Sequence, residues 1–274
     1  MHQATLFINL SKQVLCLLIL ILFFSCQEKV KTSPFSSFDK MNIAFTDEGI
    51  GDPVFLLHGF INTRKNWDKA QLKKDLLAIG YRVIAPDMRG NGDSDKPHTS
   101  VAYADNAEIK DLMALADYLE FEEYEVVGYS RGSIVLAKLL TKDKRIKKAV
   151  IGGMWAAFTD PNWEIPPMFS RAFSGEDTLV DMTRGAVEYA KSVNADLKVM
   201  SLLQANQPVT SVAELEKVST KVLVLKGDKD ESNGSAPDLQ SYLPNSRLQI
   251  IPGDHNNTYK SQFFSDAVMA FLKE

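Results

Sequence analysis

The sequence predicts an α/β fold, with a mostly parallel, twisted sheet, helices on both faces and a small helical cap insertion. Two observations carry this prediction. Short apolar runs bounded by glycine alternate with segments of helical length, which is typical of a parallel sheet covered on both sides. In addition, residues from about 155 to 219 show no clear strand pattern, and a structureless loop of that length is rare in a compact domain.

The elements of the first half follow from apolar spacing and turn residues. Three short apolar runs are expected to be strands, and they cover residues 41–46, 53–57 and 81–85. Two segments with apolar residues at helical spacing are expected to be helices, over residues 66–79 and 103–120. Gly80 is a natural end for the first of these helices.

The second half continues the alternation around the insertion. The apolar run 124–127 is expected to be a strand, followed by a sharp turn and a helix from Arg131 to about Leu140. Further strands are expected over residues 148–151, 221–225 and 247–251. Within the insertion we expect helices over about 176–192 and 194–205, and the last helix over about 259–272. The expected folded domain covers residues 40–274, with the cap at about 155–219.

Composition excludes several classes of function. The chain has 274 residues, a net charge of -4 and two cysteines, Cys16 and Cys26. Because everything after Cys26 is free of cysteine, a disulfide-stapled scaffold, a cysteine-based zinc site and a cysteine nucleophile are excluded from the folded body. The mildly acidic balance gives no positive field for nucleic acid.

The start of the chain is typical of an export signal. Residues 14–24 form an unbroken apolar run, too short to span a bilayer of roughly 30 Å but suited to the core of a signal peptide. The tripeptide Phe24-Ser25-Cys26 resembles the end of bacterial lipoprotein signals. The resemblance implies a signal peptide over residues 1–25, a lipidated Cys26 and a flexible tether over residues 26–39. The protein would then be exported to the bacterial cell envelope and anchored to a membrane.

Two alternatives to the lipoprotein signal stay open. One is an ordinary secretory signal cleaved near Ser25, and the other is an uncleaved anchor. The resemblance is incomplete, because Phe23 stands three residues before the cysteine, where such signals usually carry leucine.

The strongest chemical signal is G-x-S-x-G at Gly128, Ser130 and Gly132, between the expected strand 124–127 and the helix that follows. A serine at the tip of such a strand-to-helix turn projects its hydroxyl from the sheet, and only glycine fits on either side. The start of the following helix offers free N–H groups where an oxyanion would develop. The pattern therefore predicts a serine nucleophile.

A serine nucleophile needs a histidine base and an acid that orients it. In the chain order expected for this turn, only His255 follows the serine, since His2, His58 and His98 precede it. Two candidates for the acid, Asp228 and Asp230, lie just past the strand 221–225.

Over about residues 40–274 the chain resembles the α/β-hydrolase superfamily. The matching pieces, in the order of the family, are His58-Gly59-Phe60, the D-x-R-G-x-G-x-S loop from Asp87 to Ser94, Gly128 to Gly132, the turn from Gly227 to Asp230, and His255. The resemblance selects Asp230 over Asp228 and implies a triad of Ser130, His255 and Asp230. It also implies that the backbone N–H groups of Phe60 and Arg131 form the oxyanion hole, and it implies neither a metal nor an organic cofactor.

The resemblance implies a serine hydrolase that cleaves a carboxylic ester of a small-molecule substrate through an acyl-enzyme. Alternatives with the same triad are a carbon–carbon bond hydrolase, a thioesterase, a lactonase and a perhydrolase. Haloalkane dehalogenases and epoxide hydrolases of this fold use aspartate as nucleophile, so Ser130 argues against both. A catalytically silent envelope binding module is the alternative from another class.

Some side chains near the expected site have two interpretations. Four aromatic residues could line an acyl pocket or form the core of the cap itself, and they are Trp155, Trp163, Phe169 and Phe173. For the Arg131 side chain we expect a place on the helix surface, with contact to an acidic substrate group as the alternative.

Overall fold

The computed structural model describes residues 31–176 and 180–274. The predicted signal peptide and Cys26 lie outside this range. Within it, no helix is both long and apolar enough to cross a membrane.

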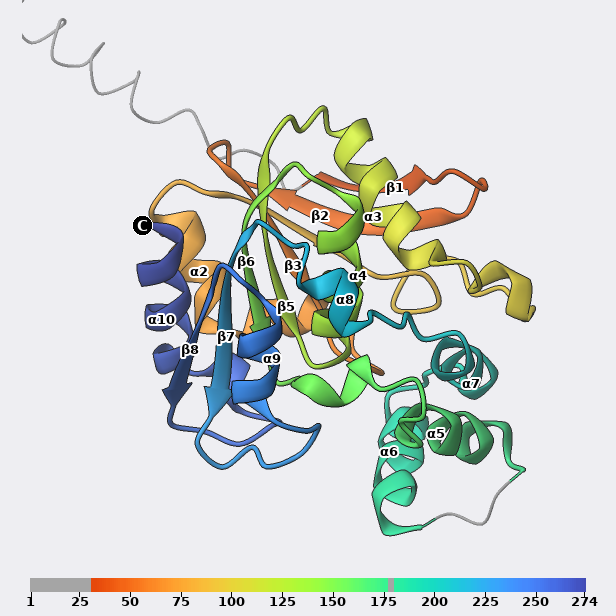
Figure 1. The fold of residues 1–274 in the computed structure, drawn as a ribbon. Coiled ribbons are helices and arrows are strands. Elements are labelled where there is room, and N and C mark those ends of the chain that lie inside the picture. The colour runs from red at the N-terminus through yellow and green to blue at the C-terminus, as the bar shows by residue number, and fades with distance from the viewer. Residues whose placement is uncertain (1–30, 177–179) are drawn as a thin grey trace, which may run out of the picture. The chain divides into compact units, whose positions relative to one another are not determined.

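A single eight-stranded sheet forms the centre of the domain (Figure 1), in the order β1-β2-β4-β3-β5-β6-β7-β8. The strands run over Lys31–Ser36 (β1), Asn42–Glu48 (β2), Pro53–Leu57 (β3), Arg82–Pro86 (β4), Tyr124–Tyr129 (β5), Ile146–Gly152 (β6), Lys221–Gly227 (β7) and Ser246–Ile251 (β8). β2 pairs antiparallel with β1 and β4, and β3 to β8 pair in parallel. The predicted fold class is therefore confirmed.

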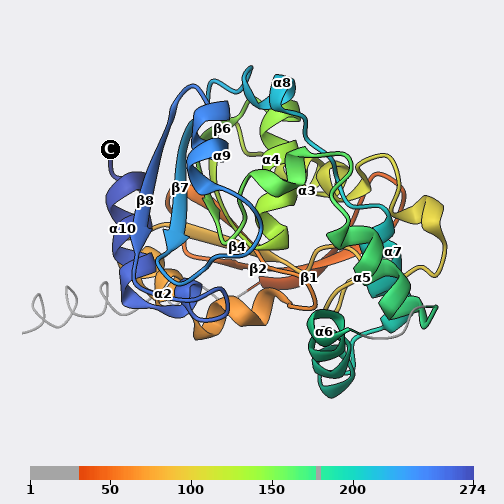
Figure 2. The ribbon, with the colours of Figure 1, turned by 60° about the horizontal axis from the view of Figure 1, so that its bottom comes forward.

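Helices cover both faces of the sheet because each presents an apolar stripe to it. On one face lie α2 (Gln71–Ala78) and α10 (Gln262–Leu272), whose buried side chains join a cluster with one side of the strands. On the other lie α3 (Ala107–Tyr118), α4 (Arg131–Lys142) and α9 (Ala236–Tyr242), which share the largest apolar cluster. Figure 2 shows α2 and α10 apart from α3, α4 and α9.

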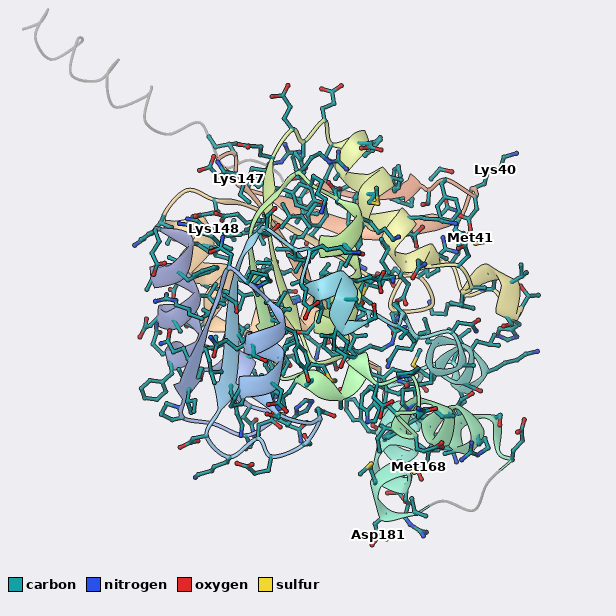
Figure 3. The ribbon with its side chains drawn as sticks, in the orientation of Figure 1. Lys40, Met41, Lys147, Lys148, Met168 and Asp181 are labelled. Atoms are coloured by element: carbon teal, nitrogen blue, oxygen red, sulfur yellow. The ribbon has the colours of Figure 1, made fainter. Side chains whose placement is uncertain are left out.

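The cap consists of α5 (Ile165–Ser174), α6 (Asp181–Ser192) and α7 (Leu197–Ala205), after the short 3-10 helix Ala156–Thr159. The short helix α8 (Val212–Leu215) then leads back to β7. The three cap helices share a small apolar cluster, which Ile61 and Tyr103 of the main domain also join. They lie beyond the carboxyl ends of the strands, as the positions of Met168 and Asp181 against Lys147 and Lys148 of β6 show in Figure 3.

The prediction that residues 26–39 form a flexible tether is wrong for Lys31–Ser36, which form β1 and pair with β2. Phe35 supplies the physical reason. Its side chain is buried in the core, with its ring centroid 5.0 Å from that of Tyr118. Pro34 is tolerated because β1 is an edge strand, where a residue without an N–H need not interrupt the hydrogen bonds between strands.

Candidate active site

Ser130 lies at the turn between β5 and α4, with a backbone φ of 53°. Positive φ is unfavourable for a residue other than glycine, so neighbouring contacts have to hold the turn in place. The Ser130 N–H donates to the carbonyl oxygen of Gly152 at 2.8 Å, and the Ser133 hydroxyl donates to the same oxygen at 2.8 Å. The end of β6 therefore fixes the backbone that carries the Ser130 hydroxyl.

Two glycines make the close packing of this turn possible. A Cβ on Gly128 would lie 2.7 Å from the carbonyl oxygen of Gly132. A Cβ on Gly132 would lie 2.4 Å from the carbonyl oxygen of Leu57. Side chains are excluded at both positions, which is the physical reason for the predicted spacing of glycines around the serine.

The predicted triad residues meet at the carboxyl ends of β5, β7 and β8. The His255 Nε2 atom lies 3.0 Å from the Ser130 hydroxyl oxygen, and Nδ1 lies 2.9 Å from an Asp230 carboxylate oxygen. The Asp230 side chain is almost fully buried, whereas that of His255 is 30% exposed. The predicted base can therefore be reached from solvent, while the predicted acid is shielded.

Asp228, the second acid candidate, has another partner. Its carboxylate accepts a hydrogen bond from the Gly253 N–H at 2.9 Å, and the Lys229 N–H donates to the Gly253 carbonyl oxygen at 3.0 Å. The turn after β7 is thereby attached to the turn before His255. Asp228 joins these two turns and Asp230 contacts the imidazole.

Asp230 has the electrostatic environment of an ionised acid. Burial raises the pKa of this carboxyl, but hydrogen bonds from His255 and Ser232 outweigh burial and bring the pKa below its ordinary value. An ionised carboxylate can only accept hydrogen bonds, so the proton of the imidazole lies on Nδ1. Nε2 is then free to accept the proton of the Ser130 hydroxyl.

The loop after β3 passes beside the serine. A Cβ on Gly59 would lie 3.3 Å from the Cβ of Ser130. Behind this loop, the buried His58 ring accepts the Met88 N–H at Nε2 (3.1 Å), so its Nδ1–H donates to the Gly59 carbonyl oxygen (2.9 Å). Burial lowers the pKa of His58, consistent with a neutral ring. His58 thus holds the loop that leads to Phe60.

The Arg131 side chain does not lie on the helix surface, so that expectation is wrong. Its guanidinium is buried and binds both carboxylate oxygens of Glu108 in α3, at 2.8 and 2.6 Å. It also donates to the carbonyl oxygen of Leu203 in α7, at 3.3 Å. A buried guanidinium needs a charged partner, and Glu108 supplies it. The bonds to Glu108 and Leu203 connect the start of α4 to α3 and to the cap.

The four predicted pocket aromatics fall into two groups. Phe169 and Phe173 belong to the cap cluster, and their rings lie 6.2 and 5.3 Å from that of Phe60. Trp155 is fully buried in the main core, and Trp163 packs against that same core. Trp155 has no accessible surface with which to line an open pocket, so that interpretation is wrong for it.

A cavity of about 310 Å³ lies between the loop after β3, the loop Gly90–Lys96 and the cap. Asn62 and Asn66 line it and also line a narrow second cavity with His58, Gly59 and Tyr129. The position of a Gly59 Cβ lies 3.3 Å from both Asn62 Nδ2 and Ser130 Cβ. Asn62 could not be identified from the sequence, since no local pattern marks its approach to the serine.

Comparisons with known proteins agree with this architecture. A model of the α/β-hydrolase fold family matches residues 52–186. A provisionally named non-heme chloroperoxidase of Synechocystis sp. is 28% identical over 78% of this chain and 87% of its own length. Epoxide hydrolase 3 of Siraitia grosvenorii is 40% identical over 35% of this chain and 29% of its own length.

Solved structures give the same result for the fold. An esterase from Exiguobacterium antarcticum superposes with a TM-score of 0.75 at 20% identity, covering 89% of this chain and all of the esterase. Together with the family match over residues 52–186 and the curated relatives, this shows that the chain is an enzyme with the α/β-hydrolase fold.

Proposed function

We propose that the protein is a serine hydrolase that cleaves carboxylic esters through an acyl-enzyme. Ser130 Oγ attacks the acyl carbon while His255 Nε2 takes its proton. The imidazolium returns that proton to the alcohol as the ester bond breaks. Water, deprotonated by His255, then attacks the acyl-enzyme and releases the acid and the free serine.

The observation that carries this proposal is the continuous hydrogen-bond chain from Ser130 through His255 to Asp230, with distances of 3.0 and 2.9 Å. The ionised Asp230 favours the imidazole tautomer that can accept from serine, and it stabilises the positive charge that develops on the ring. Such a chain has a direct use in acyl transfer and only modest value for stability at a partly exposed histidine.

The oxyanion hole of the proposed reaction consists of the Phe60 and Arg131 N–H groups. Arg131 is the first residue of α4, so its N–H has no acceptor within the helix. Phe60 follows Gly59, whose Cβ position lies beside Ser130. Donors held in this way before the reaction cost no reorganisation in the transition state, and one of them is worth roughly 2.7–4 kcal/mol in other hydrolases.

The test compares the wild type with Ser130→Ala on 4-nitrophenyl acetate, butyrate and octanoate. We expect the variant to lose on the order of 10⁴-fold or more in kcat while its Tm stays unchanged, because only the nucleophile is removed. A fluorophosphonate probe should label the wild type and not the variant. Ester turnover and labelling that both persist in Ser130→Ala would contradict the proposal.

We also propose that Cys26 becomes a lipid-anchored first residue in the envelope, as its place after the apolar run 14–24 suggests. Metabolic labelling with a fatty-acid analogue tests this. Label should be lost in Cys26→Ala and kept in Cys16→Ala, which changes the other cysteine of the chain. Absence of label from the wild type, or its survival in Cys26→Ala, would refute the anchor.

A further inference from the structure

The cavity of about 310 Å³ is connected to the proposed nucleophile by shared residues. Asn62 and Asn66 line this cavity and also the narrow cavity that reaches Tyr129, the neighbour of Ser130. Asn66 donates to the Asn62 side-chain oxygen at 3.3 Å, which fixes the amide beside the loop of Gly59. A Cβ on Gly59 would lie 3.3 Å from both Asn62 Nδ2 and Ser130 Cβ, so Asn62 is the lining residue that lies between the cavity and the serine. The volume of the cavity lies at the small end of the range for small-molecule sites.

The charged lining of this cavity is unbalanced. Lys65, Lys69 and Lys96 face it, and Asp196 is the one acidic residue among those that line it. The Asp196 carboxylate is already engaged by His98 at 2.6 Å and by the Val199 N–H at 3.2 Å. The cavity therefore presents three ammonium groups against one occupied carboxylate, in a chain whose net charge is -4.

Among the described residues, no carboxylate oxygen lies closer than 4.0 Å to any of the three lysines. Lys65 lies 4.0 Å from Asp93, and that carboxylate oxygen is bound more closely by Arg64, at 2.7 Å. Lys96 donates only to backbone carbonyl oxygens, those of Gly92 and Ser94. Among the residues that the structure describes, no side-chain partner of Lys69 is found. Carbonyl oxygens do not cancel a charge, so the positive potential stays in the cavity.

The cap contributes apolar side chains to the cavity, beside Asn194 and Asp196. Tyr189 and Val193 of the α6 end of the cap line it with Ala195 and Met200. A ligand that fits both these side chains and the lysines has an aliphatic part and an anionic group. This combination excludes a neutral, purely aliphatic ester as the best match.

We infer that the substrate is an ester whose acyl part carries a terminal carboxylate, bound in this cavity by Lys65, Lys69 and Lys96. This inference rests on the proposed ester hydrolysis and names its substrate class. The carboxylate contacts the lysines, the methylene chain lies against Val193 and Met200, and the ester carbonyl extends past Asn62 to Ser130. The lysines are exposed, so their contribution is moderate and falls with added salt.

The test uses two acyl esters that differ in one charge: 4-nitrophenyl hydrogen adipate and 4-nitrophenyl methyl adipate. We expect wild-type kcat/KM to be about tenfold higher for the carboxylate ester, as a few partly screened ion pairs allow. In Lys65→Gln/Lys69→Gln/Lys96→Gln this preference should disappear through a higher KM for the carboxylate ester. Hydrolysis of the methyl ester should stay within about twofold of wild type.

A matched control removes three exposed lysines at the amino ends of the strands: Lys142→Gln/Lys144→Gln/Lys221→Gln. Lys147 and Lys148, which mark that end in Figure 3, lie on the side of the sheet away from the cap. The control has the same net charge as the cavity variant, and it should keep the tenfold preference. Loss of the preference in the control would assign it to overall charge and overturn the cavity assignment.

Binding of monomethyl adipate to Ser130→Ala, measured by calorimetry, separates this inference from the proposed function. Weaker binding by the cavity variant of Ser130→Ala supports the anion site even if neither ester is hydrolysed. Equal rates on the two esters in the wild type, or equal binding with and without the three lysines, would overturn the substrate class. Ser130-dependent turnover of the methyl ester would then still support the esterase.

Discussion

The predicted triad at the carboxyl ends of the strands and Glu125 at the amino end of β5 differ in how their polar atoms are hydrogen-bonded. At the carboxyl end, Ser130, His255 and Asp230 form a continuous hydrogen-bond chain, and both ring nitrogens of His58 are engaged. At the amino end of β5, one carboxylate oxygen of the buried Glu125 has no hydrogen-bond partner among the described residues.

Because of this difference, we expect substitutions at the two ends of β5 to affect different properties, activity at one end and stability at the other. A change at the carboxyl end of β5 breaks a completed network, so we expect it to cost activity. At the amino end, a change can remove the buried carboxylate of Glu125, whose charge costs free energy in the folded state because Lys148 lies 4.0 Å away and one oxygen has no hydrogen bond among the described residues. We therefore expect some substitutions there to stabilise the protein without affecting the reaction.

The largest effect is expected from Asp230→Asn, which breaks the network while keeping its shape. An amide cannot stabilise the imidazolium and favours the wrong tautomer, so kcat should fall on the order of 10³- to 10⁴-fold. Asp228→Asn is the matched control, because Asp228 binds the Gly253 N–H and not the imidazole; it should lose less than about tenfold. Steady-state kinetics on 4-nitrophenyl butyrate measure both, and the reverse order would exclude Asp230 as the acid.

The next effect concerns the buried ion pair beneath the serine. Arg131→Met leaves Glu108 buried and unpaired, which should lower the free energy of unfolding by about 3–5 kcal/mol. Arg131→Met/Glu108→Leu removes both charges and should recover most of that loss. Urea unfolding followed by circular dichroism measures both variants. A double variant as unstable as the single one would mean that packing, not the uncompensated charge, is the cause.

The smallest expected effect is a gain in the free energy of unfolding from a substitution at the amino end of β5. Burial raises the pKa of Glu125 from 4.5 to about 7, against the opposing influence of Lys148. A raised pKa means that stability is fully present below the unfolded pKa and is lost as the pH rises through about 7. Glu125→Gln should therefore be more stable than wild type at pH 8, by about 1–2 kcal/mol after allowance for screening, and equal to it near pH 4.

Thermal unfolding at the two pH values measures this gain, and kcat should not change. Glu123→Gln makes the same chemical change at an exposed position nearby and serves as the control. Its stability relative to wild type should be the same at both pH values. A gain of the same size at pH 4 would show that ionisation of Glu125 is not its cause.

Much of the sheet could be predicted from the sequence, because its central strands are apolar runs with glycine at their ends. β1 could not. Its one buried aromatic side chain, Phe35, is surrounded by serine, lysine and proline, and its order comes from pairing with β2. Backbone pairing of this kind leaves little trace in composition.

In the candidate site, too, some features could be predicted from the sequence and others could not. Ser130 and His255 could be placed by motif and chain order, while the choice of Asp230 depended on a resemblance. The place of the Arg131 side chain could not be predicted, since Glu108 and Leu203 approach it only after α3 and the cap have packed. Trp155 was misassigned because an apolar residue at the start of an insertion does not reveal which core it joins.

The hydrogen bonds between the two turns that carry the acid and the base have a dynamic consequence. Asp228 binds the Gly253 N–H, the Lys229 N–H binds the Gly253 carbonyl, and the Asp228 N–H binds the Ile251 carbonyl. We expect Asp230 and His255 to belong to one unit of local opening. The Tyr129 hydroxyl donates to the His255 carbonyl oxygen at 2.8 Å, so the strand that carries Ser130 is joined to the same unit and opening should expose all three side chains together.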